Sequence, residues 1–382
     1  MSVTLKCVHS EGVGHLRYTS DGAHLLTAGA DALVKVFDVA AGGVNSNEPK
    51  TVEHPNETVV STLAMHPKGK GFVTGADSNQ VTQFSFPGGE VEKVVLRASC
   101  AIRHVEYDAK GRYLAAGLDD GVIKFGFLAM GQFTPLKAHG DSVLSLAFDP
   151  QGRYLASTSA DGTCRVWDLE ADTPEVVKVV QLSGRIAPGS PQRLRAAWHP
   201  SGGSLAVPHG AAVHVLERET WEVQSVLRGA HSKEVSLISW CDNGRYLASG
   251  GLDRQLFVWD LSTAETLDRY KAEVRARRAV PALPASHRSP PAPTPPQAGC
   301  CDLAWSPRDN TVSFIDEAGQ LGTWQKPVPT HLPSPVGDAE GALAAGSLLL
   351  REQAFAAAPR HADERCTRCL NSLPSAAAGS AA

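Results

Sequence analysis

The chain consists of short runs in which apolar and polar residues alternate, and Gly, Asp and Pro separate one run from the next. This alternation is typical of β-strands that bury one face, whereas no long segment places its apolar residues at helical spacing. In one clear example, Val143–Phe148 leads into Asp149–Gly152, where Pro150 fixes φ and Gly152 accepts a positive φ. The pattern predicts an all-β chain of tight hairpins.

The hairpins repeat. An aromatic or methionine residue stands four positions before a turn residue at seven places. The pairs are Tyr18 and Gly22, Met65 and Gly69, Tyr107 and Gly111, Phe148 and Gly152, Trp198 and Gly202, Trp240 and Gly244, and Trp305 and Asp309. Successive copies are 41 to 65 residues apart, and most spacings lie near the roughly 40–45 residues of a four-stranded propeller blade. The longest spacing precedes the last copy and predicts an insertion there.

The best-defined unit shows how each blade is expected to be built. After the first strand, Val143–Phe148, come a return strand at Arg153–Ser157, a third strand at Thr163–Asp168 and a weaker fourth strand at Glu175–Val180. Seven such units leave Val3–Val8 as a strand before the first one. We expect this strand to complete the seventh blade and close the ring, because closure removes an exposed sheet edge.

These units resemble the WD-repeat family, whose namesake dipeptide is matched by Trp167-Asp168 and Trp259-Asp260. The resemblance implies a seven-bladed WD-repeat β-propeller over residues 1–330. It includes a basic, Pro-rich insertion at 273–298, which is too polar to pack and is expected to be disordered. Residues 331–382 are rich in Ala, Pro and Ser, and we predict a disordered tail there.

A histidine, a hydroxyl residue, an aspartate and an aromatic residue recur at equal offsets in three units. The sets are His139, Ser157, Asp161 and Trp167; His231, Ser249, Asp253 and Trp259; and His9, Thr27, Asp31 and Phe37. A catalytic triad is needed once, not three times, so an esterase is the weaker interpretation. We interpret the sets as structural tetrads, in which a hydrogen-bond relay runs from the aspartate through the histidine and the hydroxyl to the Trp ring nitrogen.

Other chemistry finds little support in the sequence. Gly12–Arg17 lacks the third glycine of a dinucleotide loop and leads into a strand. Cys366 and Cys369 with His361 supply three potential zinc ligands, but a closed structural site needs four ligands and packed surroundings, so an accidental spacing is the preferred interpretation. We therefore predict no enzyme activity, no metal and no cofactor.

Charge and composition restrict the partners. Lys plus Arg number 36 and Asp plus Glu number 40, which gives a formal net charge of −4. No overall positive field exists to hold nucleic acid, so any such contact must be local. The chain shows neither a signal peptide nor an apolar run long enough to cross a membrane. We expect a soluble intracellular protein without membrane contact.

Binding is then left to the loops of the ring. Each tetrad histidine precedes a first strand and each tetrad aspartate follows a second strand, so both belong to one rim. The charged residues expected on that rim, as a partner-binding surface or simply as solvated charges, are Arg103, Asp119, Asp120, Lys233 and Arg254. The segment 273–298 is expected on the same rim. The arginines that it offers to DNA or to an import receptor, unless it is a neutral insertion, are Arg275, Arg277, Arg278 and Arg288.

A more specific resemblance rests on features that no propeller requires. Leu205–Pro208, the following Glu217–Trp221 and the stretch Asp316–Gly322 resemble the amino-terminal propeller of the acidic nucleoplasmic DNA-binding protein family, which combines WD repeats with an HMG box. The resemblance implies a nuclear, non-enzymatic scaffold of the replication fork that links the helicase to DNA polymerase alpha-primase and supports chromatin replication, repair and chromosome transmission. The trimerisation region of that family is not matched after Lys326.

One alternative comes from a different functional class. Many propellers serve as substrate receptors of cullin ubiquitin ligases, and such receptors often carry Arg two residues after the Trp-Asp pair. This chain has Glu170 and Ser262 at those positions. The receptor hypothesis, or that of another generic propeller adaptor, therefore stays open as the second one.

Overall fold

The computed structural model describes residues 6–9, 13–40, 43–44, 48–137, 139–171, 173–182, 193–271, 300–308, 311–316 and 320–325. All of these residues belong to one compact unit, Met1–Pro327. The second unit, Val328–Ala382, lies outside the described residues. The predicted tail at 331–382 and the predicted insertion at 273–298 also lie outside them.

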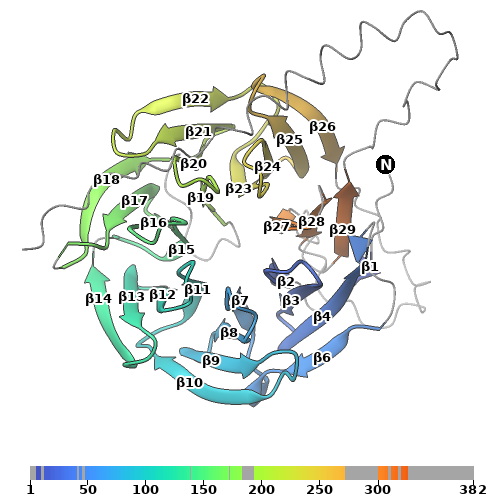
Figure 1. Cartoon of the computed structure of the whole chain (residues 1–382), viewed down its shortest axis with the longest axis vertical. Coiled ribbons are helices and arrows are strands. Elements are labelled where there is room, and N and C mark those ends of the chain that lie inside the picture. The colour runs from blue at the N-terminus through green and yellow to red at the C-terminus, as the bar shows by residue number, and fades with distance from the viewer. Residues whose placement is uncertain are drawn as a thin grey trace, which may run out of the picture. The chain divides into compact units, whose positions relative to one another are not determined.

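Seven antiparallel sheets surround a common centre, and Figure 1 shows them in a view down this ring. The predicted seven-bladed propeller is confirmed. Blade 1 consists of β2 Val13–Tyr18, β3 His24–Gly29, β4 Leu33–Ala40, β5 Gly43–Val44 and β6 Lys50–Glu53, and blade 2 consists of β7 Val60–Met65, β8 Gly71–Ala76, β9 Gln80–Ser85 and β10 Val91–Arg97. Blade 3 consists of β11 Ile102–Tyr107, β12 Tyr113–Leu118, β13 Val122–Phe127 and β14 Gln132–Lys137. Blade 4 consists of β15 Val143–Phe148, β16 Tyr154–Ser159, β17 Thr163–Asp168 and β18 Glu175–Gln181.

The remaining three blades follow the same plan. Blade 5 consists of β19 Ala197–Trp198, β20 Ser204–His209, β21 Ala212–Glu217 and β22 Val223–Leu227. Blade 6 consists of β23 Val235–Trp240, β24 Tyr246–Gly251, β25 Gln255–Asp260 and β26 Glu265–Lys271. Blade 7 consists of β27 Cys300–Trp305, β28 Thr311–Asp316, β29 Gln320–Gln325 and β1 Lys6–Cys7. A short 3-10 turn, η1 Pro55–Glu57, precedes blade 2. The first strand of each blade is the innermost one.

The ring closes through a strand from the amino-terminal end of the unit. Strand β1 pairs antiparallel with β29, with Lys6 opposite Leu321 and Cys7 opposite Gln320. It is the outermost strand of blade 7, whose other three strands come from residues 300–325. The expected closure of the seventh blade is confirmed, with Lys6–Cys7 as the paired part of the predicted strand.

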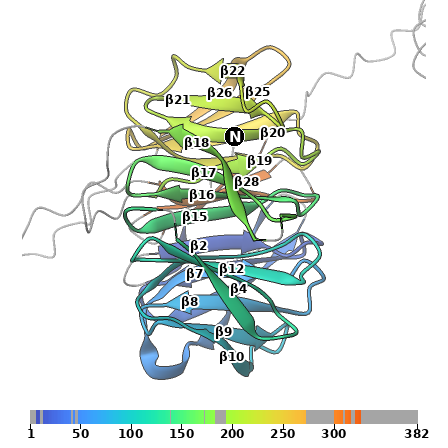
Figure 2. The same cartoon turned by 90° about the vertical axis from the view of Figure 1, so that its left-hand side faces the viewer.

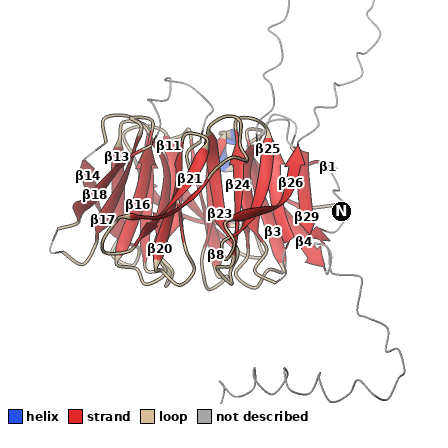
Figure 3. Cartoon of the chain, turned by 90° about the horizontal axis from the view of Figure 1, so that it is seen from above, coloured by secondary structure: helices blue, strands red, loops and turns tan. Residues whose placement is uncertain are grey.

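The turns gather at two rims, which Figures 2 and 3 show at opposite edges of the sheets. The tetrad rim holds the loops that enter the inner strands and the turns between second and third strands, such as Ser159–Gly162; the opposite rim holds the other turns. On the opposite rim, six of the seven predicted turn residues are glycines with φ between 64° and 81°, and Asp309 lies outside the described residues. Their left-handed backbone explains the glycine of the repeat.

One turn position of the tetrad rim is also left-handed in six blades, but three of these lack glycine. Gly121, Gly162 and Gly210 fill it in blades 3 to 5, and Ala32 fills it in blade 1 with φ 60°. A Cβ in this conformation is strained by about 1 kcal/mol. We expect Ala32→Gly to raise the free energy of unfolding by about 0.5–1 kcal/mol in urea titrations, and Gly162→Ala to lower it. A loss of stability in Ala32→Gly would contradict this account.

The hydrophobic core is divided among the blade interfaces. Seven clusters of buried side chains are present, and each is formed by the facing sides of two neighbouring sheets. Between blades 1 and 2, for example, Leu26 and Val34 pack with Leu63, Phe72 and Phe84, all of them fully buried. Each blade therefore depends on its two neighbours for burial, as in other repeat architectures.

In four blades the aromatic residue of the repeat ties the blade to the one before it. The indole Nε1 atoms of Trp198, Trp240 and Trp305 donate hydrogen bonds of 3.0 Å to inner-strand carbonyls of the preceding blade. In blade 1 the Tyr18 hydroxyl lies 2.7 Å from Ser313 Oγ of blade 7. In these blades the ring fills the core and its polar tip satisfies a neighbour, whereas Met65 and Phe148 occupy the same position in blades 2 and 4 without an N–H or O–H donor.

Six inner strands also share an irregularity of register between their first and third residues. In three of these strands the side chain of the third residue hydrogen-bonds an amide on the inner strand of the next blade. Thr62 Oγ1 accepts the amide of Val105 at 3.1 Å, and Asp302 Oδ2 accepts the amide of Leu16 at 3.0 Å. These bulges redirect polar side chains along the inner face of the ring, which is a common effect of bulges.

Candidate functional site

The three tetrads are hydrogen-bonded as the repeat implies. In blade 4, His139 Nδ1 lies 3.1 Å from Asp161 Oδ2 and His139 Nε2 lies 2.8 Å from Ser157 Oγ, which also accepts the Trp167 indole at 2.9 Å. Because the carboxylate accepts the Nδ1 proton, the bare Nε2 accepts the Ser157 hydroxyl. Each member therefore has a partner, and none is left to react.

The other two tetrads repeat this geometry. His231 lies 3.1 Å from Asp253 and 2.8 Å from Ser249, and Trp259 Nε1 donates to Ser249 Oγ at 2.8 Å. In blade 1, His9 lies 2.8 Å from both Asp31 and Thr27, while Phe37 takes the place of the tryptophan and offers no donor. There the ammonium of Lys35 instead donates to the Val8 carbonyl at 2.6 Å.

Burial sets the charges of the tetrads and closes them to substrates. Desolvation lowers the pKa of His9, His139 and His231 below the usual histidine value, against the opposing pull of their aspartates. Burial alone would raise the pKa of Asp161, but hydrogen bonds from Thr163, Gly140 and His139 bring it to about 2. Because Ser157 is fully buried, no substrate reaches its hydroxyl.

Removing the central hydroxyl is expected to cost stability. Ser157→Ala leaves the Trp167 indole N–H and His139 Nε2 without a partner, and each buried orphan costs about 1–3 kcal/mol. We expect the free energy of unfolding to fall by about 2–3 kcal/mol in urea titrations, with the fold retained by circular dichroism. Thr173→Ala, at an exposed position of the same blade, is the control. Unchanged stability of Ser157→Ala would show that the relay does not support the blade.

The predicted rim residues fall into two separate groups. On blade 3, Arg103 Nε lies 2.7 Å from Asp119 Oδ1, which also accepts Ser142 Oγ of blade 4 at 3.0 Å. Asp120 accepts the Val122 amide at 3.1 Å. Arg103 and Asp119 are both more than two-fifths exposed. Their ion pair remains open to solvent and to partners.

The second group lies on blade 6. Lys233 is exposed on the loop that enters β23, and Arg254 occupies the left-handed position of the β24–β25 turn with φ 61°. Blades 4 and 5 separate this group from the blade 3 group on one side of the ring, and blades 7, 1 and 2 separate it on the other. The structure therefore does not bring the five residues into one site.

Several sequence-based candidates lie outside the described residues. They are Arg275, Arg277, Arg278 and Arg288 of the segment 273–298, and His361, Cys366 and Cys369. The segment joins the end of β26 to the start of β27, and both of these strand ends belong to the tetrad rim.

A charged cluster across the inner strands was missed by the sequence analysis. Asp302 of blade 7 is contacted by two guanidinium groups, Arg17 of blade 1 at 3.1 Å and Arg195 of blade 5 at 2.7 Å. Arg17 also lies 3.5 Å from Glu106 of blade 3, and the rings of His15 and His104 are 5.0 Å apart. We call these six residues the channel cluster. Besides the neighbouring blades 7 and 1, it links blade 5 to blade 7 and blade 1 to blade 3, which are pairs of blades that share no core.

The surroundings of this cluster are electropositive. Burial, followed by Arg17, holds the pKa of His15 and of His104 well below the usual value, so both rings are neutral at pH 7. Burial, followed by Arg17, also lowers the pKa of Arg195, and burial raises the pKa of Glu106. His15 Nδ1 is 3.2 Å from Asp302 Oδ2 but not in hydrogen-bond geometry. The Asp302 carboxylate thus lies between two guanidinium groups.

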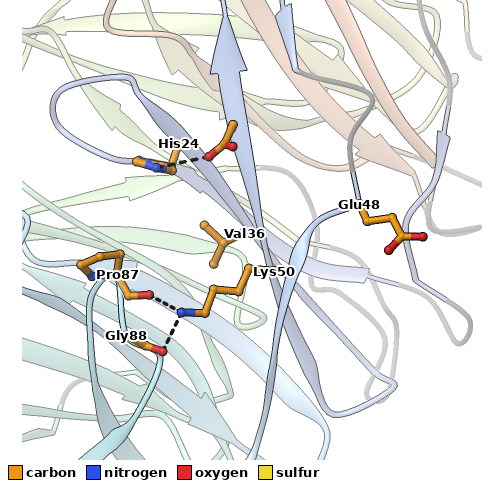
Figure 4. A pocket seen from close by; sticks show the side chains of 7 residues that line it. His24, Val36, Glu48, Lys50, Pro87 and Gly88 are labelled. Carbon is orange, nitrogen blue, oxygen red and sulfur yellow. Dashed lines mark hydrogen bonds and ion pairs between the residues drawn. The ribbon is translucent and has the colours of Figure 1, made fainter.

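A pocket of about 380 Å³ lies between blades 1 and 2 on the opposite rim (Figure 4). Lys50 Nζ lies beside it and donates to the carbonyls of Pro87 and Gly88 at 2.7 and 2.9 Å, and His24 Nε2 lies 3.4 Å from Asp38. Because Lys50 already bridges the two blades, this contact is a brace between blades. Nothing in the pocket assembles a nucleophile with a base.

Within the described ranges, no three His, Cys, Asp or Glu side chains gather in a way that would hold a metal ion. No helix in that part of the chain is long and apolar enough to span a membrane.

Residues 6–279 match the sequence family described as the WDHD1 first WD40 domain. The chain belongs to this family. The match spans β1 to the end of blade 6 and so includes all three tetrads. It confirms the resemblance that Leu205–Pro208 and Glu217–Trp221 indicated.

Named relatives agree with this membership. The chain is 28% identical over 317 residues to mouse "WD repeat and HMG-box DNA-binding protein 1", and the aligned region covers 82% of this chain and 26% of the mouse protein. It is 23% identical over 328 residues to fission yeast "Minichromosome loss protein 1", covering 85% and 36%, and 24% identical over 293 residues to fission yeast "Protein hir1". The chain thus spans about a quarter to a third of the first two relatives.

Proposed function

We propose that this chain is a non-enzymatic interaction scaffold of the replication fork in the nucleus, linking the helicase to DNA polymerase alpha-primase. The family membership over residues 6–279 carries the proposal. Relatives named for an HMG box with DNA binding and for minichromosome loss support a role in replicating chromatin, repair and chromosome transmission. The buried hydroxyls of the tetrads support a role without catalysis.

The tetrad rim is the proposed partner surface. It carries two charged groups at the ends of strands and on the adjoining loops. One consists of Arg103, Asp119 and Asp120 on blade 3, and the other consists of Lys233 and Arg254 on blade 6. Rigid presentation favours loop contacts, because little order has to be gained on binding. We expect each partner to contact only one of these two groups, since the groups lie on blades that are not neighbours.

Affinity capture from replicating cells tests the fork role. The tagged chain is compared with Arg103→Glu, with Lys233→Glu and with a control, Lys178→Glu, on the outer strand β18. Recovery of helicase or polymerase subunits that falls in one rim variant and not in the control supports the proposal. Recovery of cullin adaptors instead would establish the substrate-receptor alternative and sink the scaffold at the fork.

The arginines at 275, 277, 278 and 288 are proposed to contact DNA weakly or to serve nuclear import. Deleting residues 273–298 is expected to reduce retention on duplex DNA, with retention of the intact chain falling steeply as salt is added. The same deletion, in a fluorescently tagged chain, tests import. Unchanged retention and unchanged nuclear signal would remove this segment from the proposal.

A further inference from the structure

The opposite rim carries a basic surface on blades 2 and 3. Lys68 and Lys70 lie on the β7–β8 turn, Lys110 and Arg112 lie on the β11–β12 turn, and all four are exposed. Within the described residues, none of the three lysine ammonium groups has an ion-pair or hydrogen-bond partner. The Arg112 guanidinium is 3.9 Å from Asp108, whose carboxylate mainly accepts the turn amides. In a chain of net charge −4, this is a local exception.

The two turns form one surface because they are in direct contact. A Cβ at Gly111 would lie only 2.4 Å from His66 Nε2, so the imidazole rests on the backbone of the next turn. The ring also stands edge-on to Tyr107 at 5.2 Å, and its Nδ1 accepts the Lys68 amide at 3.1 Å. The two turns are therefore held against each other, and each carries two exposed cations.

Blades 5 and 6 show that this contact does not require the cations. There His199 rests on Gly244 in the same way, with Nε2 3.1 Å from the Gly244 carbonyl and Nδ1 accepting the Ser201 amide at 3.1 Å. The cation of that pair of turns, Arg245, is 3.0 Å from Asp260 and thus neutralised. The unpaired charge of blades 2 and 3 is an added property with no role in packing.

A turn adjoining that of Arg112 carries an exposed apolar side chain. Met130, on the β13–β14 turn of the same rim, is 72% exposed. Its turn is tied to the basic one, since the Leu128 amide donates to the Arg112 carbonyl at 2.9 Å. An exposed methionine on a rim that also carries exposed cations suits a peptide partner, because the flexible thioether adapts to different apolar side chains.

We propose that Lys68, Lys70, Lys110, Arg112 and Met130 form a docking surface for an acidic peptide segment that carries one apolar residue. Four surface charges alone bind weakly at physiological salt. A peptide side chain that covers Met130 adds about tenfold to a hundredfold in affinity, which a phosphate backbone does not supply. The surface deepens the proposed scaffold role, on which it rests, by naming a class of partner and a second rim.

Fluorescence anisotropy with labelled probes tests the surface. The probes are a glutamate-rich peptide with one leucine, the same peptide with serine in place of leucine, and a duplex DNA of arbitrary sequence. We expect the leucine peptide to bind at low salt, to bind about tenfold to a hundredfold more weakly to Lys68→Gln/Lys70→Gln/Lys110→Gln, and about tenfold more weakly to Met130→Gln. The serine peptide should bind as weakly to the intact chain as the leucine peptide binds to Met130→Gln.

The controls separate the alternatives. Lys137→Gln, an exposed lysine at the end of β14 and outside both proposed surfaces, should leave peptide affinity unchanged, and thermal melting should show all variants folded. Absence of peptide binding, or its loss in Lys137→Gln, would overturn the assignment. Tighter binding of the duplex, with a salt slope that drops by about one per lysine removed and no effect of Met130→Gln, would assign the surface to nucleic acid instead. Peptide binding that persists when capture recovers no fork proteins would leave the surface intact and remove the fork role.

Discussion

Replacing Asp302 by asparagine is expected to destabilise the ring by about 3–5 kcal/mol. The substitution keeps the shape of the side chain but removes the negative charge that lies 3.1 Å from Arg17 and 2.7 Å from Arg195. Asp302 is 1% exposed and Arg17 is 9% exposed, so water cannot replace the lost partner. Urea unfolding followed by circular dichroism measures the change.

A surface carboxylate provides the matched control. Asp119→Asn breaks an ion pair of equal length with Arg103, but both side chains are more than two-fifths exposed, and such pairs contribute below about 1 kcal/mol. If both variants lost the same stability, the channel cluster would not stabilise the ring by burial. Adding Arg195→Met to Asp302→Asn should recover part of the loss, because it removes one uncompensated charge.

Stability is expected to fall as the pH drops from 6.5 to 5. His9, His15, His104, His139 and His231 all have a pKa lowered by burial in the folded state. The unfolded chain binds protons at these residues near pH 6.5 while the folded chain does not, so their contribution is present above pH 6.5 and is lost on acidification. His15 and His104 alone should give a slope of about 3 kcal/mol per pH unit below about pH 6.

The measurement is the free energy of unfolding in urea at several pH values between 5 and 7.5. His15→Gln should flatten the curve by about 1.4 kcal/mol per pH unit, because one proton-binding group is removed from the unfolded chain. His24→Gln is the control, since His24 lies on the opposite rim near Asp38. A curve that stays flat in the intact chain would mean that the buried histidines already carry protons in the folded state.

Sequence reasoning found the ring because its repeat is local. The strand, the aromatic residue at its end and the turn glycine lie within a few positions of one another, and β15 and β17 have the predicted bounds. The hydrogen-bond relay of the tetrads was predicted from equal sequence offsets for the same reason. Local chemistry of this kind repeats wherever the same backbone geometry repeats.

The channel cluster could not be predicted from the sequence, because its residues are far apart along the chain and belong to no local pattern. Arg17, Glu106, Arg195 and Asp302 are single charges in four inner strands or their approaches, and each alone resembles a solvated position. Only the ring brings blade 7 within 2.7 Å of blade 5 across the centre. The sequence held one usable signal, which is the distance of these charges from the aromatic residue of the repeat: Arg195 and Asp302 stand three residues before it, and Arg17 and Glu106 stand one residue before it. There a bulge or the ring centre redirects the side chain.

The basic surface on blades 2 and 3 was missed for a different reason. Lys68, Lys70, Lys110 and Arg112 are ordinary turn residues in the sequence, and the net charge of −4 directed attention to the segment 273–298. Their proximity depends on His66 resting on Gly111, a contact between adjacent blades. The sequence also gave no way to separate them from Arg153 and Arg245, which are neutralised by Asp168 and Asp260.

The pairing of Lys6 with Leu321 means that the ring cannot close until nearly all of the propeller has been synthesised. During translation the first strand leaves the ribosome with no partner, and its partner follows only after about 300 further residues, or roughly 15–60 s at typical elongation rates. Throughout that interval blade 1 exposes an apolar surface that blade 7 covers in the finished ring and that is lined by Leu16, Leu25 and Phe37. The nascent polypeptide therefore needs shelter from neighbouring chains until its last blade emerges, and the demand for chaperones should be greatest just before the circle is complete.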